Sequence, residues 1–390
     1  MSKIENLINE KCPNGVIFKK VWELTTWDKK YNAVDNFMQP KVKKYNYLLA
    51  NKLSEIVDST GNVLILETGI NGTKKYTTEE LAGDNLCDGE IIAIPWGGTP
   101  NVKYYSGKFV TGDNRIAVSN DPNVLNTKFL YYLFEDRMTE IADFYRGSGI
   151  KHPEMKKVLL MNIPVPPLEV QQEIVRILDK FGELEAELEA ELEARRSQYE
   201  FWRGKLLASD YDVMKLGEIC SIKTGSKPKE VLEFGTYEYI NAGTTNSGYV
   251  EHTNAKGDCV TTPSRGQGGI GFVGYQANEF WCGPLCYQIR ALNDNLNNRY
   301  LYYYMLANNR YILGLKHEGG VPAVNIKELQ EMPIITPPLA EQERIVNILD
   351  KFDKLVNDIS VGLPAEIEAR RKQYEYYRNK LLSFKEVSCE

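Results

Sequence analysis

Apolar residues recur every three or four positions through the middle of the chain, between Pro167 and Ala208. This spacing places them on one face of an α-helix, which has 3.6 residues per turn. The stripe consists of Ile174, Ile177, Leu178, Phe181, Leu184, Leu188 and Leu192, and it continues with Tyr199, Trp202 and Leu206. Gly and Pro are absent between Glu183 and Trp202. The pattern predicts one uninterrupted helix of about 39 residues.

Three tandem copies of the tetrapeptide Glu-Leu-Glu-Ala occupy residues 183–194 of this predicted helix. Ala, Glu and Leu all have high helix propensity. A four-residue repeat is longer than one helical turn, so each copy turns the leucine stripe by about 40° around the helix axis. A helix of this length with an apolar stripe needs a second helix to cover it.

The sequence supplies a second helix, because both ends of this segment occur twice. “PPLEVQQEIVRILDKF” (166–181) recurs as “PPLAEQERIVNILDKF” (337–352), and “EARRSQYEFWRGKLL” (193–207) recurs as “EARRKQYEYYRNKLL” (368–382). The second stripe consists of Ile345, Ile348, Leu349, Phe352, Leu355 and Ile359, and it resumes with Ile367, Tyr374, Tyr377 and Leu381. Gly362 and Pro364 predict a break or kink in this helix, since Pro lacks a backbone donor.

The segments before the two helices are related more weakly and indicate two globular domains with a common frame. “GEIIAIPWGG” (89–98) corresponds to “GDCVTTPSRG” (257–266), and “KFLYYL” (128–133) corresponds to “RYLYYY” (299–304). Alternating apolar residues between Gly, Asn and Asp turns predict short strands, and the tyrosine-rich segments predict helices. The fold class is therefore α+β. We divide the chain into a globular domain at 1–167, a helix at 168–208, a second domain at 209–338, a second helix at 339–384 and a tail at 385–390.

The distribution of charge along the chain is more informative than the net charge. The net charge is −6, but residues 168–207 alone hold 10 acidic and 6 basic side chains. Residues 1–167 hold 20 acidic and 21 basic side chains, so a basic patch for nucleic acid is not excluded there. The seven Cys are scattered, and no apolar run reaches the roughly 20 residues of a membrane span. These features favour a cytoplasmic protein with no membrane partner.

Motifs for catalysis or metal binding are weak. “GQGGIG” (266–271) matches a dinucleotide-binding pattern, but a strand-like segment follows where that motif needs a helix. A glycine-rich turn is the favoured interpretation. Cys282 and Cys286 have no second Cys or His pair nearby, and zinc needs three or four protein ligands, so both are expected to be buried thiols. We expect no catalytic residue and no metal site.

Several basic segments are candidates for contact with nucleic acid. Lysines and backbone amides typically contact phosphate, whereas Arg, Asn and Gln can bind base edges. The candidates are Lys41, Lys43, Lys44, Lys74 and Lys75 in the first domain and Lys223, Lys227, Lys229, Arg265 and Gln267 in the second.

The duplicated Pro-Pro-Leu…Gln…Ile-Val-x-x-Leu-Asp segments, separated by globular domains, resemble the specificity subunit of type I restriction–modification enzymes over essentially the whole chain. The resemblance implies that each globular domain recognises one half of a bipartite DNA target. It also implies a pseudo-twofold repeat in which the two helices pack as an antiparallel coiled coil and set the spacer, with residues 2–10 near the end of the second helix. The expected spacer and docking residues are Leu184, Leu188, Leu192, Tyr199, Trp202, Ile359, Tyr374 and Tyr377.

The same resemblance implies the partners and the absence of cofactors. Double-stranded DNA is one partner, and two modification subunits, which carry an adenine methyltransferase activity, dock on the helices. Restriction subunits join that core. S-adenosylmethionine, ATP and Mg²⁺ are expected only on the partner subunits, so this chain is expected to hold no cofactor and to be no enzyme.

Two other interpretations stay open from the residues alone. One is a non-catalytic, duplicated coiled-coil scaffold with two ligand-binding heads that are not specific for DNA. The other is an enzyme that uses the glycine-rich loop. Binding of random duplexes across a salt series separates the first from a DNA reader, because phosphate contacts release counterions. Binding of S-adenosylmethionine to the isolated chain would support the second.

Overall fold

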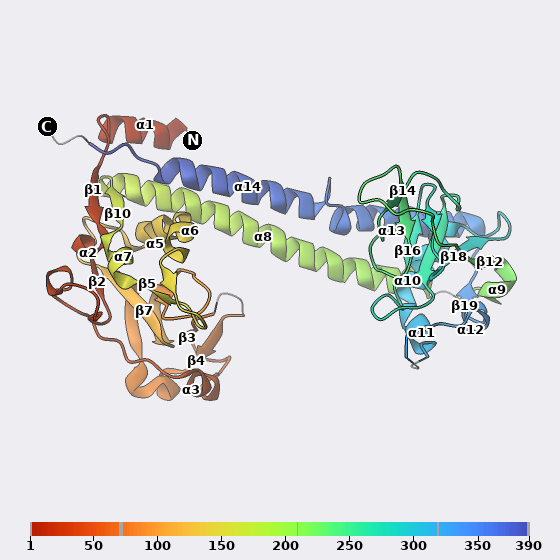
Figure 1. Cartoon of the computed structure of the whole chain (residues 1–390), viewed down its shortest axis with the longest axis horizontal. Helices are drawn as coiled ribbons and strands as arrows, with labels where there is room; N and C mark the ends of the chain where they lie inside the picture. Colours follow the sequence, from red (N-terminus) through yellow and green to blue (C-terminus); the bar gives the residue numbers. More distant parts are fainter. Residues whose placement is uncertain (1, 70–72, 209, 318–319, 388–390) are drawn as a thin grey trace. The chain divides into compact units, whose positions relative to one another are not determined.

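The computed structural model describes residues 2–69, 73–208, 210–317 and 320–387. The chain forms two compact units (Figure 1). Unit 1 comprises residues 1–186 and 369–390, and unit 2 comprises residues 187–368. Each unit therefore combines one globular domain with parts of both long helical segments. Within the described part of the chain, no helix is long and apolar enough to cross a membrane.

Unit 1 is built on a mixed sheet with the strand order β2-β7-β5-β6-β3-β4. These strands are β2 Thr25–Trp27, β7 Asn114–Ser119, β5 Cys87–Pro95, β6 Lys103–Thr111, β3 Val63–Leu66 and β4 Lys75–Thr77. Neighbours are antiparallel except β3 and β6. Two further pairs are β1 Ile17–Lys20 with β10 Asn162–Val165, and β8 Tyr145–Arg146 with β9 His152–Pro153. The helices are α1 Ser2–Lys11, α2 Val21–Leu24, α3 Ala50–Glu55, α4 Glu79–Ala82, α5 Thr127–Asp136, α6 Met138–Ala142 and α7 Met155–Leu160, with short 3₁₀ turns at Asn36–Met38 and Gly83–Asn85.

Unit 2 contains a smaller sheet with the order β12-β18-β15-β16. These strands are β12 Cys220–Thr224, β18 Cys286–Ala291, β15 Cys259–Pro263 and β16 Gly274–Gln276. A second sheet has the order β14-β13-β17, with β14 Tyr249–Val250, β13 Tyr237–Ile240 and β17 Trp281–Cys282, and β11 Val213–Lys215 pairs with β19 Pro333–Ile335. The helices of this domain are α9 Leu216–Ile219, α10 Asn298–Ala307, α11 Asn309–Gly314 and α12 Ile326–Gln330.

The two domains share a frame, as the sequence predicts. The order β12-β18-β15-β16 repeats β2-β7-β5-β6, and the β11·β19 pair repeats β1·β10. Beyond this frame the units differ, because β3 and β4 extend the sheet of unit 1 whereas unit 2 has its separate sheet of β14, β13 and β17. The four shared strands give both units the same sheet edge, and the strands found in one unit only give each unit a different surface.

The long helices follow the predicted periodicity with one correction. The first, α8, runs without interruption over Leu168–Leu207, 40 residues. The second is broken into α13 Leu339–Asn357 and α14 Leu363–Leu382, as Gly362 and Pro364 predict. A Cβ on Gly362 would lie 2.5 Å from the carbonyl oxygen of Lys354, so the break requires glycine. Ile359 was expected in the packing stripe, but α13 ends before it and its side chain is 85% exposed.

The helices pack in an antiparallel manner inside unit 1. The ring of Phe181 on α8 lies 5.6 Å from that of Tyr377 on α14, and Glu185 pairs with Arg371 at 2.6 Å. Residue numbers rise along one helix as they fall along the other, which confirms the antiparallel prediction. In unit 2, Tyr199 stacks on Phe352 of α13 at 6.2 Å, which is the repeat counterpart of the Phe181–Tyr374 contact of unit 1.

The stripe residues differ in how deeply they are buried. Leu184, Leu188 and Leu192 are half-buried, whereas Tyr199 is buried. Trp202, which was expected in the same stripe, is 36% exposed, because among the described residues its ring contacts are with Phe201 and Lys205 of its own helix and not with the second helical segment. Its repeat equivalent Tyr377 is half-buried.

The first helix of the chain lies against the end of the last one, as the resemblance implies. Helix α1 runs beside the end of α14 (Figure 1), and Glu5 pairs with Lys380 at 2.7 Å. Lys11 also pairs with Glu169 at the start of α8, at 3.3 Å.

The duplicated segments contain a buried glutamine that joins each long helix to its domain. The side-chain oxygen of Gln171 accepts from the amide of Asn126, the N-cap of α5, at 2.8 Å. Its nitrogen donates to the carbonyls of Val124 and Pro166, both at 2.8 Å. Gln342 makes the same three bonds in unit 2, to Asn297, Asn295 and Pro337, at 2.8, 2.9 and 2.8 Å. The repeated Gln is therefore structural.

A second repeated pair reinforces this junction. Asp179 accepts from the hydroxyl of Tyr132 at 2.5 Å and pairs with Lys128 at 2.7 Å. In unit 2, Asp350 accepts from the hydroxyl of Tyr303 at 2.5 Å and pairs with Arg299 at 2.8 Å. The repeated Leu-Asp positions thus anchor the helices to α5 and α10.

We expect Gln171→Ala to lower the free energy of unfolding of unit 1 by about 2–4 kcal/mol, because one buried amide and two carbonyls lose their partners. Chemical denaturation should show this loss. Gln172→Ala is the matched control, because the side chain of Gln172 is exposed. Equal stability of the two variants would contradict the structural role of Gln171.

Candidate nucleic-acid interface

A basic groove of about 850 Å³ opens on unit 1 between the loop after β2, the edge of the sheet and the β8–β9 hairpin. Six basic side chains line it, against one carboxylate, that of Glu154. The basic residues are Lys29, Lys30, Arg115, Arg146, Lys156 and Lys157. Lys157 and Arg146 pair with Glu154, at 2.5 and 3.4 Å. Three further carboxylates, those of Asp28, Asp113 and Asp35, pair with Lys29, Arg115 and Lys156, so a small positive excess remains.

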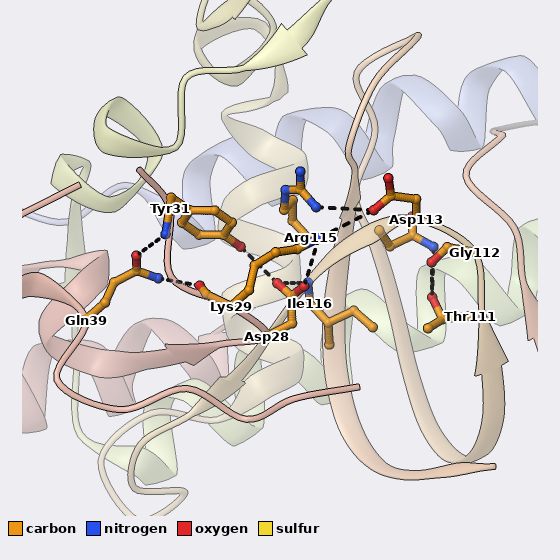
Figure 2. A network of polar contacts seen from close by, with 10 residues as sticks. Asp28, Lys29, Tyr31, Gln39, Thr111, Gly112, Asp113, Arg115 and Ile116 are labelled. Carbon is orange, nitrogen blue, oxygen red and sulfur yellow. Dashed lines mark hydrogen bonds and ion pairs between the residues drawn. The ribbon is translucent and has the colours of Figure 1, made fainter. Parts of the chain in front are cut away.

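The floor of the groove is an ordered polar network (Figure 2). The carboxylate of Asp28 accepts from the Tyr31 hydroxyl at 2.9 Å and from the amide of Ile116 on β7 at 3.2 Å. Gln39 holds the loop from outside, because it accepts from the amide of Tyr31 and donates to the carbonyl of Lys29, both at 2.9 Å. These bonds fix the 28–39 loop against the sheet.

Arg115 is the buried cation at the centre of this network (Figure 2). Its guanidinium pairs with Asp113 at 3.3 Å and lies 5.3 Å from the ring centroid of Trp96 and 5.6 Å from that of Tyr31. Such contacts over aromatic faces hold a cation without full neutralisation. Because Arg115 is buried between them, we infer that its role is to position the rings of Trp96 and Tyr31.

Trp96 and His152 form the rim of the groove. Their rings lie 4.0 Å apart, and His152 Nδ1 is 2.8 Å from the carbonyl oxygen of Trp96. Trp96 is 42% exposed. Aromatic faces and exposed cations together are the side chains that bind bases and phosphates.

Protonation of Asp28 should affect the stability of unit 1. Burial raises the pKa of Asp28 above its ordinary value, although the Tyr31 hydrogen bond opposes the shift. The folded protein then holds this proton more tightly than the unfolded chain, so the Asp28 contribution to stability falls as the pH rises from about 4 through the raised pKa. Asp28→Asn keeps an acceptor oxygen and should remove this slope. Unfolding measured from pH 4 to 8 checks it, and a constant difference between the two proteins would contradict it.

The lysines expected from the sequence in unit 1 lie outside this groove. Lys41 and Lys43 line a second hollow of about 480 Å³ beside β2 and the end of β7. Lys74 and Lys75 line a third, of about 240 Å³, with Lys103, whose pKa is lowered to about 8 by burial. Lys44 is exposed and lines neither the groove nor these two hollows. The structure does not bring the five lysines together.

Arg265 of unit 2 occupies the place that corresponds to the rim of the unit 1 groove. Gly98 donates to the carbonyl of Lys151 at 3.0 Å, and Gly266, next to Arg265, donates to that of Pro322 at 3.0 Å. Arg265 is exposed. The equivalent loops therefore carry Trp96 in unit 1 and an exposed arginine in unit 2.

The other basic loop of unit 2 shares a turn with Arg265. Gly225 donates to the carbonyl of Gly283 at 3.1 Å, and Ser264 donates to that of Leu285 at 2.9 Å. The segment that begins with Lys223 on β12 and continues to Lys227 and Lys229 is thus hydrogen-bonded to the 282–285 turn, as is the segment that leads into Arg265 and Gln267. All five of these predicted side chains are exposed.

The weak catalytic motifs have structural explanations. Residues 266–271 form turns that lead into β16, so no helix follows the glycines. Gly266 and Gly271 have positive φ of 144° and 90°, which favours glycine at both positions. Cys282 and Cys286 are buried free thiols, as expected. No cluster of three or more potential metal ligands occurs among the residues the structure describes.

Sequence reasoning missed the groove residues of unit 1. Two basic clusters carried a signal, “DKKY” (28–31) and “EMKK” (154–157), each a lysine pair beside aromatic or acidic residues. Arg115 gave none, because “NRIAVS” (114–119) reads as an ordinary buried strand.

Comparisons with known proteins add an independent line of evidence. A family model described as “Type I restriction modification DNA specificity domain” matches residues 29–194 and again 208–369. A putative type I restriction enzyme specificity subunit of Haemophilus influenzae is 32% identical over 328 residues, which cover 76% of this chain and 83% of that protein. The EcoR124I/EcoR124II specificity subunit of Escherichia coli is 32% identical over 303 residues, 69% of this chain and 74% of that one.

Solved structures share the fold at lower identity. The crystal structure of the S subunit of a type I restriction–modification system from M. genitalium has a TM-score of 0.66 at 19% identity. It covers 94% of this chain and 96% of its own.

Proposed function

This chain belongs to the family of type I restriction–modification DNA specificity subunits, and from this premise we propose how its two units divide the reading of DNA. Unit 1 reads one half of a bipartite target with the basic groove, and unit 2 reads the other half with the Arg265 edge. The duplicated, non-identical frame carries the proposal. The same backbone contact at Gly98 and Gly266 supports two loops of different chemistry.

The side chains at each edge suit the two tasks of DNA recognition. In unit 1, Lys30, Arg146 and Lys156 supply charge for phosphates, and the Trp96–His152 rim offers contacts for base edges. In unit 2, Lys227 and Lys229 suit phosphates, while an exposed arginine can bind guanine through two hydrogen bonds. The predicted lysines at 41–44 and 74–75 remain candidates for phosphate contacts beyond the groove.

The partner subunits would supply the chemistry. S-adenosylmethionine, ATP and Mg²⁺ are assigned to the modification and restriction subunits, and this chain to recognition. Two aromatic pairs support docking of two modification subunits. Phe201 and Trp202 on α8 lie 5.5 Å apart, and their repeat equivalents Tyr376 and Tyr377 on α14 lie 5.2 Å apart. Phe201 and Tyr376 are each 61% exposed, as expected for interface aromatics without their partner.

Arg265→Ala tests the unit 2 edge. If Arg265 binds a guanine, the variant should weaken binding of the cognate site by about 1–3 kcal/mol and relax one half of the target only. Binding of the purified complex to cognate and half-site-scrambled duplexes across a salt series measures both effects. Gln330→Ala is a distant control on α12. A uniform loss on all sequences with a smaller salt slope would assign Arg265 to phosphate, and no change would remove this edge from the DNA.

A further inference from the structure

The junction between helices and domain contains a cluster of tyrosines and an arginine that occurs in both units. In unit 1 this cluster is closed by one carboxylate, Glu135 on α5. Glu135 accepts from the hydroxyl of Tyr131 at 3.0 Å and from that of Tyr374 at 2.7 Å, and it pairs with Arg378 at 3.7 Å. Asp136 also pairs with Arg378, at 3.4 Å.

Unit 2 keeps the donors of this cluster and lacks its acceptors. By the offsets of the repeat, Tyr199 and Arg203 on α8 replace Tyr374 and Arg378, and the cation again lies over the ring, at 5.1 Å. Leu306 and Ala307 stand where unit 1 has Glu135 and Asp136. Both carboxylates are therefore absent from α10.

The donors in unit 2 are left without an acceptor. The buried hydroxyl of Tyr199 has no hydrogen-bond partner among the described residues, and the guanidinium of Arg203 lies over the Tyr199 ring. Arg203 can only donate, so it cannot receive the hydroxyl proton of Tyr199. A buried unpaired hydroxyl is unfavourable, and one acceptor would satisfy both side chains.

Two carboxylates of unit 2 lie near this cluster, and both have other partners. Glu238 accepts from the side chain of Asn246 at 3.4 Å. Asp353 on α13 stands where unit 1 has Gly182. It pairs with Arg299 at 3.4 Å and accepts from Asn357 at 2.9 Å. Asp353 therefore stabilises Arg299 and does not take the place of Glu135.

Space for an external group lies beside these donors. A groove of about 520 Å³ is lined by Tyr199, Arg203 and Leu306, together with the apolar side chains of Ile240 and Phe272. In the described part of unit 1, the corresponding donors already have an acceptor in the same chain, the carboxylate of Glu135.

We propose that this groove of unit 2 binds a carboxylate side chain of a partner polypeptide, which bonds Tyr199 and Arg203 as Glu135 bonds their equivalents in unit 1. The proposal rests on the proposed function, in which the partner is the modification subunit. Glu238 and Asp353 also line the groove and repel any anion, but they would repel a run of phosphates more than one carboxylate, so charge favours a single carboxylate over DNA. The side chains of Ile240, Phe272 and Leu306 offer apolar contacts for the methylene stem of a glutamate within this otherwise polar groove.

The test supplies the missing carboxylate from within the chain. Leu306→Glu places a glutamate at the position of Glu135, where it should occupy the two donors and exclude the partner's carboxylate. Leu306→Gln is the matched neutral control. Tyr199→Phe and Arg203→Gln each remove one donor. Association of the full-length chain with the purified modification subunit is measured by analytical ultracentrifugation, with thermal unfolding and DNA binding of each variant.

We expect Tyr199→Phe, Arg203→Gln and Leu306→Glu each to weaken association about tenfold, and Leu306→Gln to change it much less. The double variant Tyr199→Phe/Arg203→Gln should lose less than the product of the single losses, since both bind one group. Leu306→Glu should keep the melting temperature of wild type or raise it.

Three results would overturn the proposal. Unchanged association in all three variants would show that no partner group binds here. A lower melting temperature for Leu306→Glu than for Leu306→Gln would show that the donors are not free to accept a carboxylate. Loss of DNA binding with association unchanged would make the occupant a phosphate. If the wild-type chain bound DNA selectively but did not associate with the modification subunit, only the identity of the partner would be refuted. If it neither bound DNA selectively nor associated with that subunit, the proposed function would be refuted.

Discussion

Exchange of residues 1–167 for the matching segment of a relative with another target is expected to replace one half of the methylated sequence and to leave the other half unchanged. The expectation follows from the two separate cores. The core around Trp27, Phe129 and Ile174 belongs to unit 1, and the core around Tyr300, Met332 and Leu349 belongs to unit 2. Each unit can therefore fold around its own recognition surface.

The exchanged segment must keep its contacts with the retained helix. Gln171 accepts from the backbone amide at the N-cap of α5, and Asp179 accepts from the Tyr132 hydroxyl, so a donor segment with a backbone N–H at the first position and Tyr at the second should join without strain. Sequencing of methylated DNA from cells with each chimera measures the target. The reciprocal exchange of 208–338 is the control and should alter only the other half. A chimera that altered both halves would contradict independent readers.

Removal of one Glu-Leu-Glu-Ala copy is expected to change the unspecified spacer between the half-sites by about one base pair, with both half-sites retained. The deletion shortens α8 by about 6 Å and rotates everything beyond it by about 40°. The three copies, 183–194, include the boundary between the two units, so the deletion acts between the two readers. Each reader must stay in phase with its groove, and 40° is close to the twist of about one base pair.

The helix should survive this change. The leucines of the repeat are only half-buried, and α8 has no break within them. Variants with two, three and four copies, each tested by sequencing of methylated sites, give the spacer directly. A variant with three copies in which Glu187 and Glu189 are both replaced by Gln controls for the two lost charges at constant length. An equal spacer in all variants would show that the repeat does not set the distance.

The long helices were predictable because their signal is local. A 3.6-residue period over 168–207 specifies one helix wherever the rest of the chain lies, and Gly362 and Pro364 end another. Ile359 shows the limit of this reasoning. Its spacing continued the stripe, but the break begins before it and leaves the side chain in solvent.

The recognition groove was not predictable, because it depends on long-range pairing. Lys29, Arg115 and Lys156 are far apart in the sequence and meet only because β2 pairs with β7 and the β8–β9 hairpin lies beside them. The internal repeat supplies part of this long-range information, because a contact seen in one unit can be transferred to the equivalent residue of the other. Arg265 was expected from the sequence, and only the equivalence of Gly266 with Gly98 shows that it lies at the same edge.

Sequencing of DNA methylation in cells with and without this gene, in the presence of the modification subunit, tests the central claim most directly. We expect one methylated motif that appears only with the gene and consists of two specified halves separated by an unspecified spacer. A gene-dependent motif without a spacer, or an identical methylation pattern with and without the gene, would contradict it.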